Sequence, residues 1–237
     1  MSGWAPKRFW KAASVVEAEG GYGIALDGRA VKTPAKAALV VPTRALAEAL
    51  AAEWEAQAEL VNPATMPTTR TANSAIDKVR PQRAEVAELV AAYGGTDLLC
   101  YRAEAPDALV ARQEALWDPL LDWAAQALRA PLAVTRGVVP VAQSEAALAA
   151  LQAEVAALDE WQLSALHDLV GITGSLVLGL AVAHGRIPVE EAWTLSRIDE
   201  DWQAEQWGLD EEAAEHAALR RAALLDAARF WALRHAQ

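Results

Sequence analysis

The residues most able to do chemistry gather in one stretch, "DEDWQAEQWGLDEEAAEH", which runs from Asp199 to His216. It holds eight carboxylates, two tryptophans and one histidine, with no lysine or arginine. Paired carboxylates can act as general acid and base, and together with histidine they bind divalent metals. The same composition also suits a solvated helix end or a surface that binds another protein. The stretch therefore has four interpretations: a metal site, a catalytic pair, a helix end or a docking surface.

The spacing of these residues does not match the common motifs of metal sites or catalytic nucleophiles. No H-E-x-x-H or C-x-x-C occurs, and Glu212-Ala-Ala-Glu-His216 lacks the spacing of the Glu-x-x-His pairs in di-iron bundles. There is no P-loop, and "GGYGIALDG" lacks the third glycine of a dinucleotide-binding fingerprint. Ser175 in "GITGSLVLG" does not satisfy G-x-S-x-G. We therefore predict no catalytic residue, no metal and no cofactor.

Charge and composition exclude further classes of partner and location. Lysine and arginine number 21 against 32 carboxylates, a net charge of -11, so we predict that the protein binds no nucleic acid. The uncharged run 169–183 is shorter than the roughly 18–20 residues that cross a bilayer, so we expect a buried central helix and no membrane insertion. Cys100 is the only cysteine, and "MSGWAPKRFWKAAS" has no apolar signal-peptide core. These features predict a bacterial cytoplasmic location.

The N-terminal part of the chain predicts a small antiparallel sheet. "YGIAL" and "RAVKT" are strand-like runs on either side of Asp27-Gly28, the dipeptide typical of a type I′ hairpin turn. "AALVV" predicts a further strand that ends at a proline. The later segment "VNPATMPTTRTANSAID" is rich in Pro, Asn and Thr, so we expect an ordered connector without a long regular element.

A helix over 44–60 lies between this sheet and the connector, with Thr43 as its expected N-cap. Trp54 falls on its apolar face, and so do Glu53 and Gln57. A core-facing stripe normally excludes such polar groups. Either they are buried and hydrogen-bonded, or this face meets a partner or a cleft. We take these three residues as structural or interface residues.

The remainder of the chain is rich in alanine and predicts a helical domain. The fold class that follows is α+β, with a β-rich domain over residues 1–75 and a helical domain over residues 76–237. We expect helices at about 78–92, 107–128, 144–158, 160–183, 188–207 and 210–235, with a short strand-like run at 132–141.

The acidic stretch divides into two parts when it is placed on helices. Trp202 and Glu205 share a face, whereas Trp207 lies in the last turn before Gly208, which we expect to end the helix as its C′ glycine. The reversing chain is then expected to wrap the Trp207 ring. Acidic residues after the glycine, Glu212 among them, fall in the first turn of the next helix, where they complement its dipole. Glu205 is then either a paired, buried group or a recognition point for a cation on a partner.

Six segments, in their order along the chain, resemble a known family. They are "LDGRAVKTP", "LAAEWEAQ", "NPATMPTTRTANSAID", "TDLLCYRA", "WDPLLDW" and "EDWQAEQWG". Together they resemble the assembly chaperones of the F1-ATPase alpha subunit, the family of the mitochondrial ATP synthase assembly factor 2 and its alphaproteobacterial relatives. The resemblance covers residues 8 to 235.

This resemblance implies a non-enzymatic protein, and it suggests a monomer. Such a chaperone binds the unassembled alpha subunit and shields the surface that will later meet the beta subunit. Glu205 matches the acidic residue of the C-terminal element and Trp54 matches the tryptophan of E-W-x-x-Q, whereas "LDEEAAEH" departs from the usual acidic-His spacing. The expected partner-binding residues are Glu205, Trp202, Trp207, Asp201 and Glu212.

Two alternatives stay open on the sequence alone. One is a helical scaffold for another protein partner. The other is a carboxylate-dependent enzyme in which Glu205 works with Asp201 or Glu212, with or without a divalent cation. Converging carboxylates in a cleft would favour the enzyme.

Overall fold

A computed structural model describes residues 7–208 and 210–236. The chain groups into two compact units, which are described separately. The described residues of the first unit are 7–83, 160–165 and 229–236, and those of the second are 84–159, 166–208 and 210–228. The α+β class is confirmed, with antiparallel strands near the N-terminus and helices over most of the remainder. The division into domains 1–75 and 76–237 stays a prediction.

Four short strands form the sheet of the first unit, with β2 at its centre. The chain reverses between β2 and β3 at Asp27 and Gly28, whose φ values of 46° and 82° confirm the expected I′-type turn. Strand β2 also pairs antiparallel with β1 and β4. The bounds are β1 (Ala13–Ala18), β2 (Gly21–Leu26), β3 (Arg29–Ala30) and β4 (Val40–Val41).

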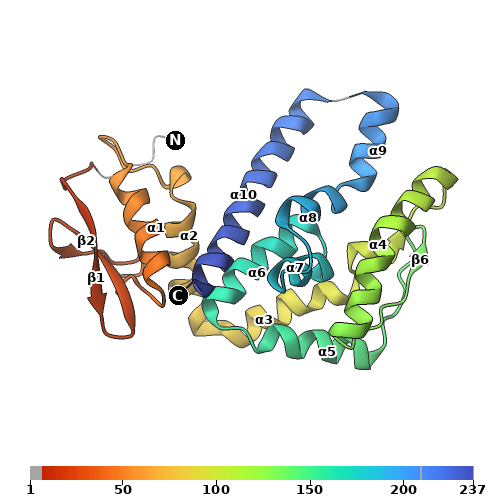
Figure 1. The fold of residues 1–237 in the computed structure, drawn as a ribbon, viewed down its shortest axis with the longest axis horizontal. Helices are drawn as coiled ribbons and strands as arrows, with labels where there is room; N and C mark the ends of the chain where they lie inside the picture. The colour runs from red at the N-terminus through yellow and green to blue at the C-terminus, as the bar shows by residue number, and fades with distance from the viewer. Residues whose placement is uncertain (1–6, 209, 237) are drawn as a thin grey trace. The chain divides into compact units, whose positions relative to one another are not determined.

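Helix α1 (Arg44–Glu55) packs beside this sheet (Figure 1). Thr43 caps it as predicted, since its hydroxyl oxygen accepts a hydrogen bond from the Leu46 amide at 3.2 Å. The helix ends at Glu55 and not at residue 60. The core under the sheet is a cluster of buried apolar side chains that includes Ile24, Val41, Leu46, Leu50, Trp161 and Phe230.

The sequence left open whether Glu53 and Gln57 are hydrogen-bonded within the fold or face a partner or a cleft. In the structure both side chains are hydrogen-bonded inside the first unit. The Glu53 carboxylate accepts hydrogen bonds from the amides of Thr68 and Thr69, at 2.7 and 2.8 Å, and from the Thr69 hydroxyl at 2.7 Å. These amides lie in the first turn of α2 (Pro67–Ser74), so Glu53 caps a second helix. Gln57 is only 4% exposed, and its Oε1 accepts a hydrogen bond from the Asn62 amide at 2.7 Å.

Replacing Glu53 by alanine should lower the free energy of unfolding by about 2 kcal/mol, because the first turn of α2 loses its acceptor. Glu48 is the matched control, since it lies on the same helix and is exposed. Glu48→Ala should change the stability by less than about 0.5 kcal/mol. Urea unfolding of the three proteins measures both values, and equal midpoints for both variants would contradict the capping role.

The prediction of a connector without a long regular element is wrong. Helix α2 continues through a π-helical turn, η2 (Ala75–Val79), and a 3-10 turn, η3 (Arg80–Gln82), into α3 (Arg83–Ala91). Pro67 is tolerated because it occupies the first turn, where no intrahelical partner for its missing N–H exists. Pro81 lies in η3, where the hydrogen-bond pattern changes.

The second unit is helical apart from one pair of two-residue strands. The strand-like run at 132–141 contributes only β6, which pairs parallel with β5. The elements from residue 92 onward are η4 (Ala92–Gly95), η5 (Leu98–Cys100), β5 (Tyr101–Arg102), α4 (Asp107–Ala127), β6 (Thr135–Arg136), α5 (Glu145–Ala156), α6 (Glu160–Thr173), α7 (Leu176–Ala183), α8 (Val189–Leu195), α9 (Ile198–Trp207) and α10 (Glu211–His235).

The helix predicted over 160–183 is two helices, α6 and α7. Gly174 separates them at a φ of 72°, and Ser175 caps α7 through its hydroxyl oxygen, which accepts from the Leu178 amide at 3.0 Å. The fully buried Asp97 completes this cap: its carboxylate accepts from the Ser175 hydroxyl at 2.7 Å and from the Val177 amide at 2.9 Å. The start of a buried helix has no access to water, so these groups supply the acceptors it needs.

The helix predicted over 188–207 is also two helices, α8 and α9. The break lies at Ser196 and Arg197, and the indole N–H of the buried Trp117 donates to the Leu195 carbonyl at 2.9 Å. A carbonyl at the end of α8 is thereby satisfied without water. The break matters for function because it sets the direction of α9, which carries most of the candidate site. As expected, α7 is buried along most of its length. The helices of the described residues include none with the length and apolar character of a membrane span.

Candidate functional site on helix α9

Helix α9 presents the acidic, tryptophan-containing stretch on the surface of the second unit. Its first residue, Ile198, is 4% exposed and anchors the helix. Gly208 ends it at a φ of 94°, which confirms the predicted helix end. Beyond the gap at residue 209, the Asp210 carboxylate accepts from the Ala213 amide at 3.1 Å, so it caps α10 as the capping interpretation requires.

Glu205 is paired with Arg112 of helix α4. The two guanidinium nitrogens Nη1 and Nη2 donate to the two carboxylate oxygens, each at 2.9 Å. The same guanidinium lies over the Trp202 ring, 4.8 Å from its centroid. The hydrogen bond from Arg112 lowers the pKa of Glu205, and the bond to Glu205 raises the pKa of Arg112. The structure therefore shows that Glu205 is paired, as one of the two alternatives expected, but the group is exposed and not buried.

Arg112 is the residue of this site that sequence reasoning missed. It lies 93 positions before Glu205, in the helix "DALVARQEALWDPLLDWAAQA". No local pattern marks it, because the contact depends on how α4 packs against α9. A charged, planar group that bridges a carboxylate and an indole ring is a common arrangement at protein-binding surfaces.

Trp207 is 79% exposed, so the expectation that the reversing chain wraps its ring is wrong. Within the described residues, the chain after Gly208 does not cover the ring. Trp202, in contrast, is half-buried beneath Arg112. The exposed Trp207 ring and the half-buried Trp202 ring line one hollow, and together they offer a large apolar contact surface with polar edges.

The other two candidate carboxylates do not converge on Glu205. Asp201 lies 3.4 Å from Arg197 on its own helix, and Glu212 lies in the exposed first turn of α10. A carboxylate-dependent reaction would need two of these groups at one point, and Glu205 and Asp201 are instead each matched with a different arginine. No cluster of three metal-ligating side chains occurs in the part of the chain that the structure describes.

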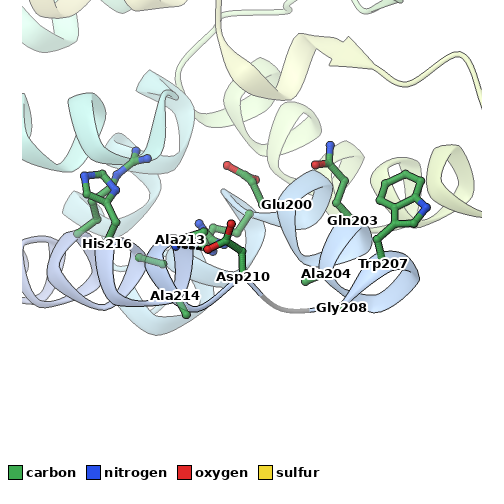
Figure 2. A pocket seen from close by; sticks show the side chains of 12 residues that line it. Glu200, Gln203, Ala204, Trp207, Gly208, Asp210, Ala213, Ala214 and His216 are labelled. Atoms are coloured by element: carbon green, nitrogen blue, oxygen red, sulfur yellow. Dashed lines mark hydrogen bonds between the residues drawn. The ribbon is translucent and has the colours of Figure 1, made fainter.

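Among the hollows that border α9, two are lined by both Gln203 and Trp207. One, of about 390 Å³, lies between α9 and the start of α10 (Figure 2). Figure 2 shows Glu200, Gln203 and Trp207 extending from α9, with His216 at the other end. The second, of about 630 Å³, lies between α9, the segment 101–106 and Val138.

Trp54, with Glu53 and Gln57, belongs to the first unit. Its indole lies half-buried between two apolar clusters and makes an edge contact with Trp10, at a centroid distance of 5.3 Å. Its Nε1 is buried with no hydrogen-bond partner among the described residues. Trp54 therefore contributes through packing.

Comparison with known proteins gives consistent results over most of the chain. The family model described as ATP12 chaperone protein matches residues 7–125. The crystal structure of Atp12 from Paracoccus denitrificans is 55% identical, covers 97% of this chain and 98% of its own, and superposes with a TM-score of 0.94. Atu1473, a putative chaperone from Agrobacterium tumefaciens, is 46% identical over 96% of this chain and 85% of its own, with a TM-score of 0.92. Protein atp12 of Schizosaccharomyces pombe, a mitochondrial protein, is 27% identical over 88% of this chain and 76% of its own length.

Proposed function

Because the chain belongs to the ATP12 chaperone family, we propose that it is a non-enzymatic assembly chaperone for the F1 sector of ATP synthase. It binds the unassembled alpha subunit, shields that subunit's interface from aggregation and releases it into the alpha/beta hexamer. The observation that carries this proposal is the whole-chain similarity to a solved Atp12, at 55% identity. The family resemblance inferred from the six ordered motifs is confirmed by the same comparison.

The surface around α9 supports a binding role of this kind. It combines the exposed ring of Trp207 with the ordered pair of Arg112 and Trp202. Tryptophan and arginine are enriched at the points of protein interfaces that contribute most to affinity. Acidic side chains around them keep the free chaperone soluble and favour release, since polar contacts are screened by salt and exchange readily with water.

We propose that the partner-binding residues are Glu205, Trp202, Trp207, Asp201 and Glu212, and we add Arg112. In this proposal Glu205 acts through Arg112: both carboxylate oxygens are occupied by the guanidinium, which is thereby held over Trp202. Trp202 and Trp207 supply the contact area. Asp201 and Glu212 supply charge at the edge.

Replacing Glu205 by lysine should weaken binding of the alpha subunit about tenfold or more, while the unfolding midpoint stays close to that of the parent. Lysine would place a second cation against Arg112 and drive the guanidinium off the Trp202 ring. The conservative variant Glu205→Asp keeps a carboxylate opposite Arg112, so the guanidinium stays near the Trp202 ring and most of the affinity should be retained. Titration calorimetry with purified alpha subunit measures all three proteins, and normal binding by Glu205→Lys would contradict the assignment.

The partner itself is tested by capture from cells. Mass spectrometry of what co-purifies with the native protein should identify the F1 alpha subunit as the dominant species. A different dominant partner would instead favour the helical-scaffold alternative.

A further inference from the structure

We infer that the 630 Å³ hollow beside α9 binds an extended segment of the partner that carries a lysine or arginine next to an apolar side chain. The hollow, called here the Trp202 groove, is lined among others by Glu104, Leu109, Val138, Asp199, Trp202 and Trp207. Its partner is taken from the proposed function, so the inference rests on that function.

The walls of the Trp202 groove are apolar and largely open to solvent. Val138 is 92% exposed and Trp207 is 79% exposed, whereas Leu109, at 7%, forms part of the floor. Val139, beside Val138, is 71% exposed. Large apolar side chains that gather around one concave surface are typical of a site that a partner covers. An apolar side chain of the partner would remove these surfaces from water.

Two carboxylates of the groove have no cation within the described residues. The Asp199 carboxylate accepts a hydrogen bond from Gln113 Nε2 at 2.6 Å, and Gln113 Oε1 in turn accepts from the Ala103 amide at 2.8 Å. This chain of bonds fixes the carboxylate in place without neutralising it. Burial raises the pKa of Asp199, which reflects the cost of leaving that charge uncompensated. Glu104 lies against Gly137, where an added Cβ would come within 2.8 Å of the Glu104 Oε1 atom.

The one arginine of the groove wall does not supply the missing charge. Arg102 is 3% exposed, and its Nη2 donates to Asp118 at 2.6 Å. Its guanidinium also lies over the buried Trp117 ring, at 5.1 Å from the centroid. Arg102 is therefore held by Asp118 and Trp117, and its buried Nε and Nη1 have no hydrogen-bond partner among the described residues. No ion pair in the described part of the chain joins it to Glu104 or Asp199, so the charge of these two carboxylates remains for a ligand.

Carboxylates that line the same groove as the exposed indole ring of Trp207 match the side chains of lysine and arginine. The cationic head is attracted both to the carboxylates and to the ring face, and the aliphatic stem packs on the apolar wall. An anionic ligand, nucleic acid included, would meet uncompensated negative charge. The charge of the groove thus favours a ligand with a basic residue flanked by apolar residues. An unassembled subunit exposes such residues on the surface that is buried after assembly.

Substitutions in the groove test this inference with purified alpha subunit as the probe. Asp199→Asn removes the charge and keeps the acceptor for Gln113, whereas Trp207→Ala and Val138→Ser remove apolar wall. Each substitution should weaken binding of the alpha subunit about tenfold. Asp199→Asn should also make the affinity less dependent on salt concentration. Matched controls are Glu190→Gln for charge and Leu219→Ser for apolar surface, because both residues are exposed outside the groove. These controls should bind as the parent does.

The outcomes separate this inference from the proposed function. If the parent binds alpha subunit and the three groove variants bind equally well, the groove is not the docking site and the proposed function stands. If the parent does not bind alpha subunit at all, the proposed function itself fails. If the parent sediments as a dimer and Trp207→Ala as a monomer, the groove is occupied by a second copy of this chain and the inference is overturned.

A crosslink identifies the chemistry of the bound segment directly. A photoreactive amino acid in place of Val138 should label one alpha-subunit peptide, in which a lysine or arginine lies next to an apolar residue. A labelled peptide without a basic residue would overturn the assignment of a cation to Glu104 and Asp199.

Discussion

Replacing Trp54 by arginine lowers the free energy of unfolding by about 4 kcal/mol, because the change removes a packed indole and places a charge among apolar side chains. Trp54 lies between the cluster of Ile24, Leu46 and Leu50 and the smaller cluster around Trp10. Its indole N–H has no hydrogen-bond partner in the described part of the chain, so the loss comes from packing and from the buried charge. Denaturant unfolding followed by circular dichroism measures the change.

Trp207→Arg is the matched control for this prediction, since the same substitution is made at a ring that is 79% exposed. It should shift the stability by less than about 0.5 kcal/mol. If Trp54→Arg unfolds at the same denaturant concentration as the parent, Trp54 is not a packing residue of the first unit.

Replacing Asp97 by alanine should lower the free energy of unfolding by about 3–4 kcal/mol, because it leaves buried donors without an acceptor. The carboxylate accepts from the Leu99 amide at 3.0 Å, the Ser175 hydroxyl at 2.7 Å and the Val177 amide at 2.9 Å. Burial raises the pKa of this carboxyl, and the hydrogen bonds from Val177, Ser175 and Leu99 offset part of that rise. The residue thus holds the η4–η5 segment to the start of α7.

Asp122→Ala, at an exposed position of α4, is the control for Asp97→Ala. It should unfold within about 0.5 kcal/mol of the parent. A second variant, Asp97→Asn, keeps one carbonyl oxygen in the same place, so its loss should fall between the two. Equal stability of Asp97→Ala and Asp122→Ala would contradict the capping role of Asp97.

Features of the fold that depend on neighbouring residues could be predicted from the sequence. The turn at Asp27-Gly28, the Thr43 cap and the helix end at Gly208 each follow from a residue type and the one or two residues beside it. The order of six motifs also identified the family, because their sequence along the chain is far more specific than any one of them.

Features that depend on tertiary packing could not be predicted. Nothing in the apolar run 169–183 predicts that the helix breaks at Gly174. The break depends on Asp97, a residue far away in the sequence, which accepts a hydrogen bond from Ser175 at the start of the second helix. Glu205 was singled out, yet its partner Arg112 lies 93 positions away. The sequence places Glu53 and Gln57 on an apolar helix face but does not predict their partners. In the structure Glu53 accepts hydrogen bonds at the start of α2, and Gln57 accepts one from the Asn62 amide.

We propose that this protein binds unassembled F1 alpha subunit and keeps it from aggregating. The most direct measurement is light scattering of isolated alpha subunit, diluted from denaturant with and without an equimolar amount of this protein. Free subunits that expose an apolar interface aggregate readily, so the alpha subunit alone should scatter strongly. We expect the protein to suppress that scattering at equimolar amounts and to form a complex with alpha subunit on gel filtration. Unchanged aggregation at equimolar amounts, with no complex, would contradict the account.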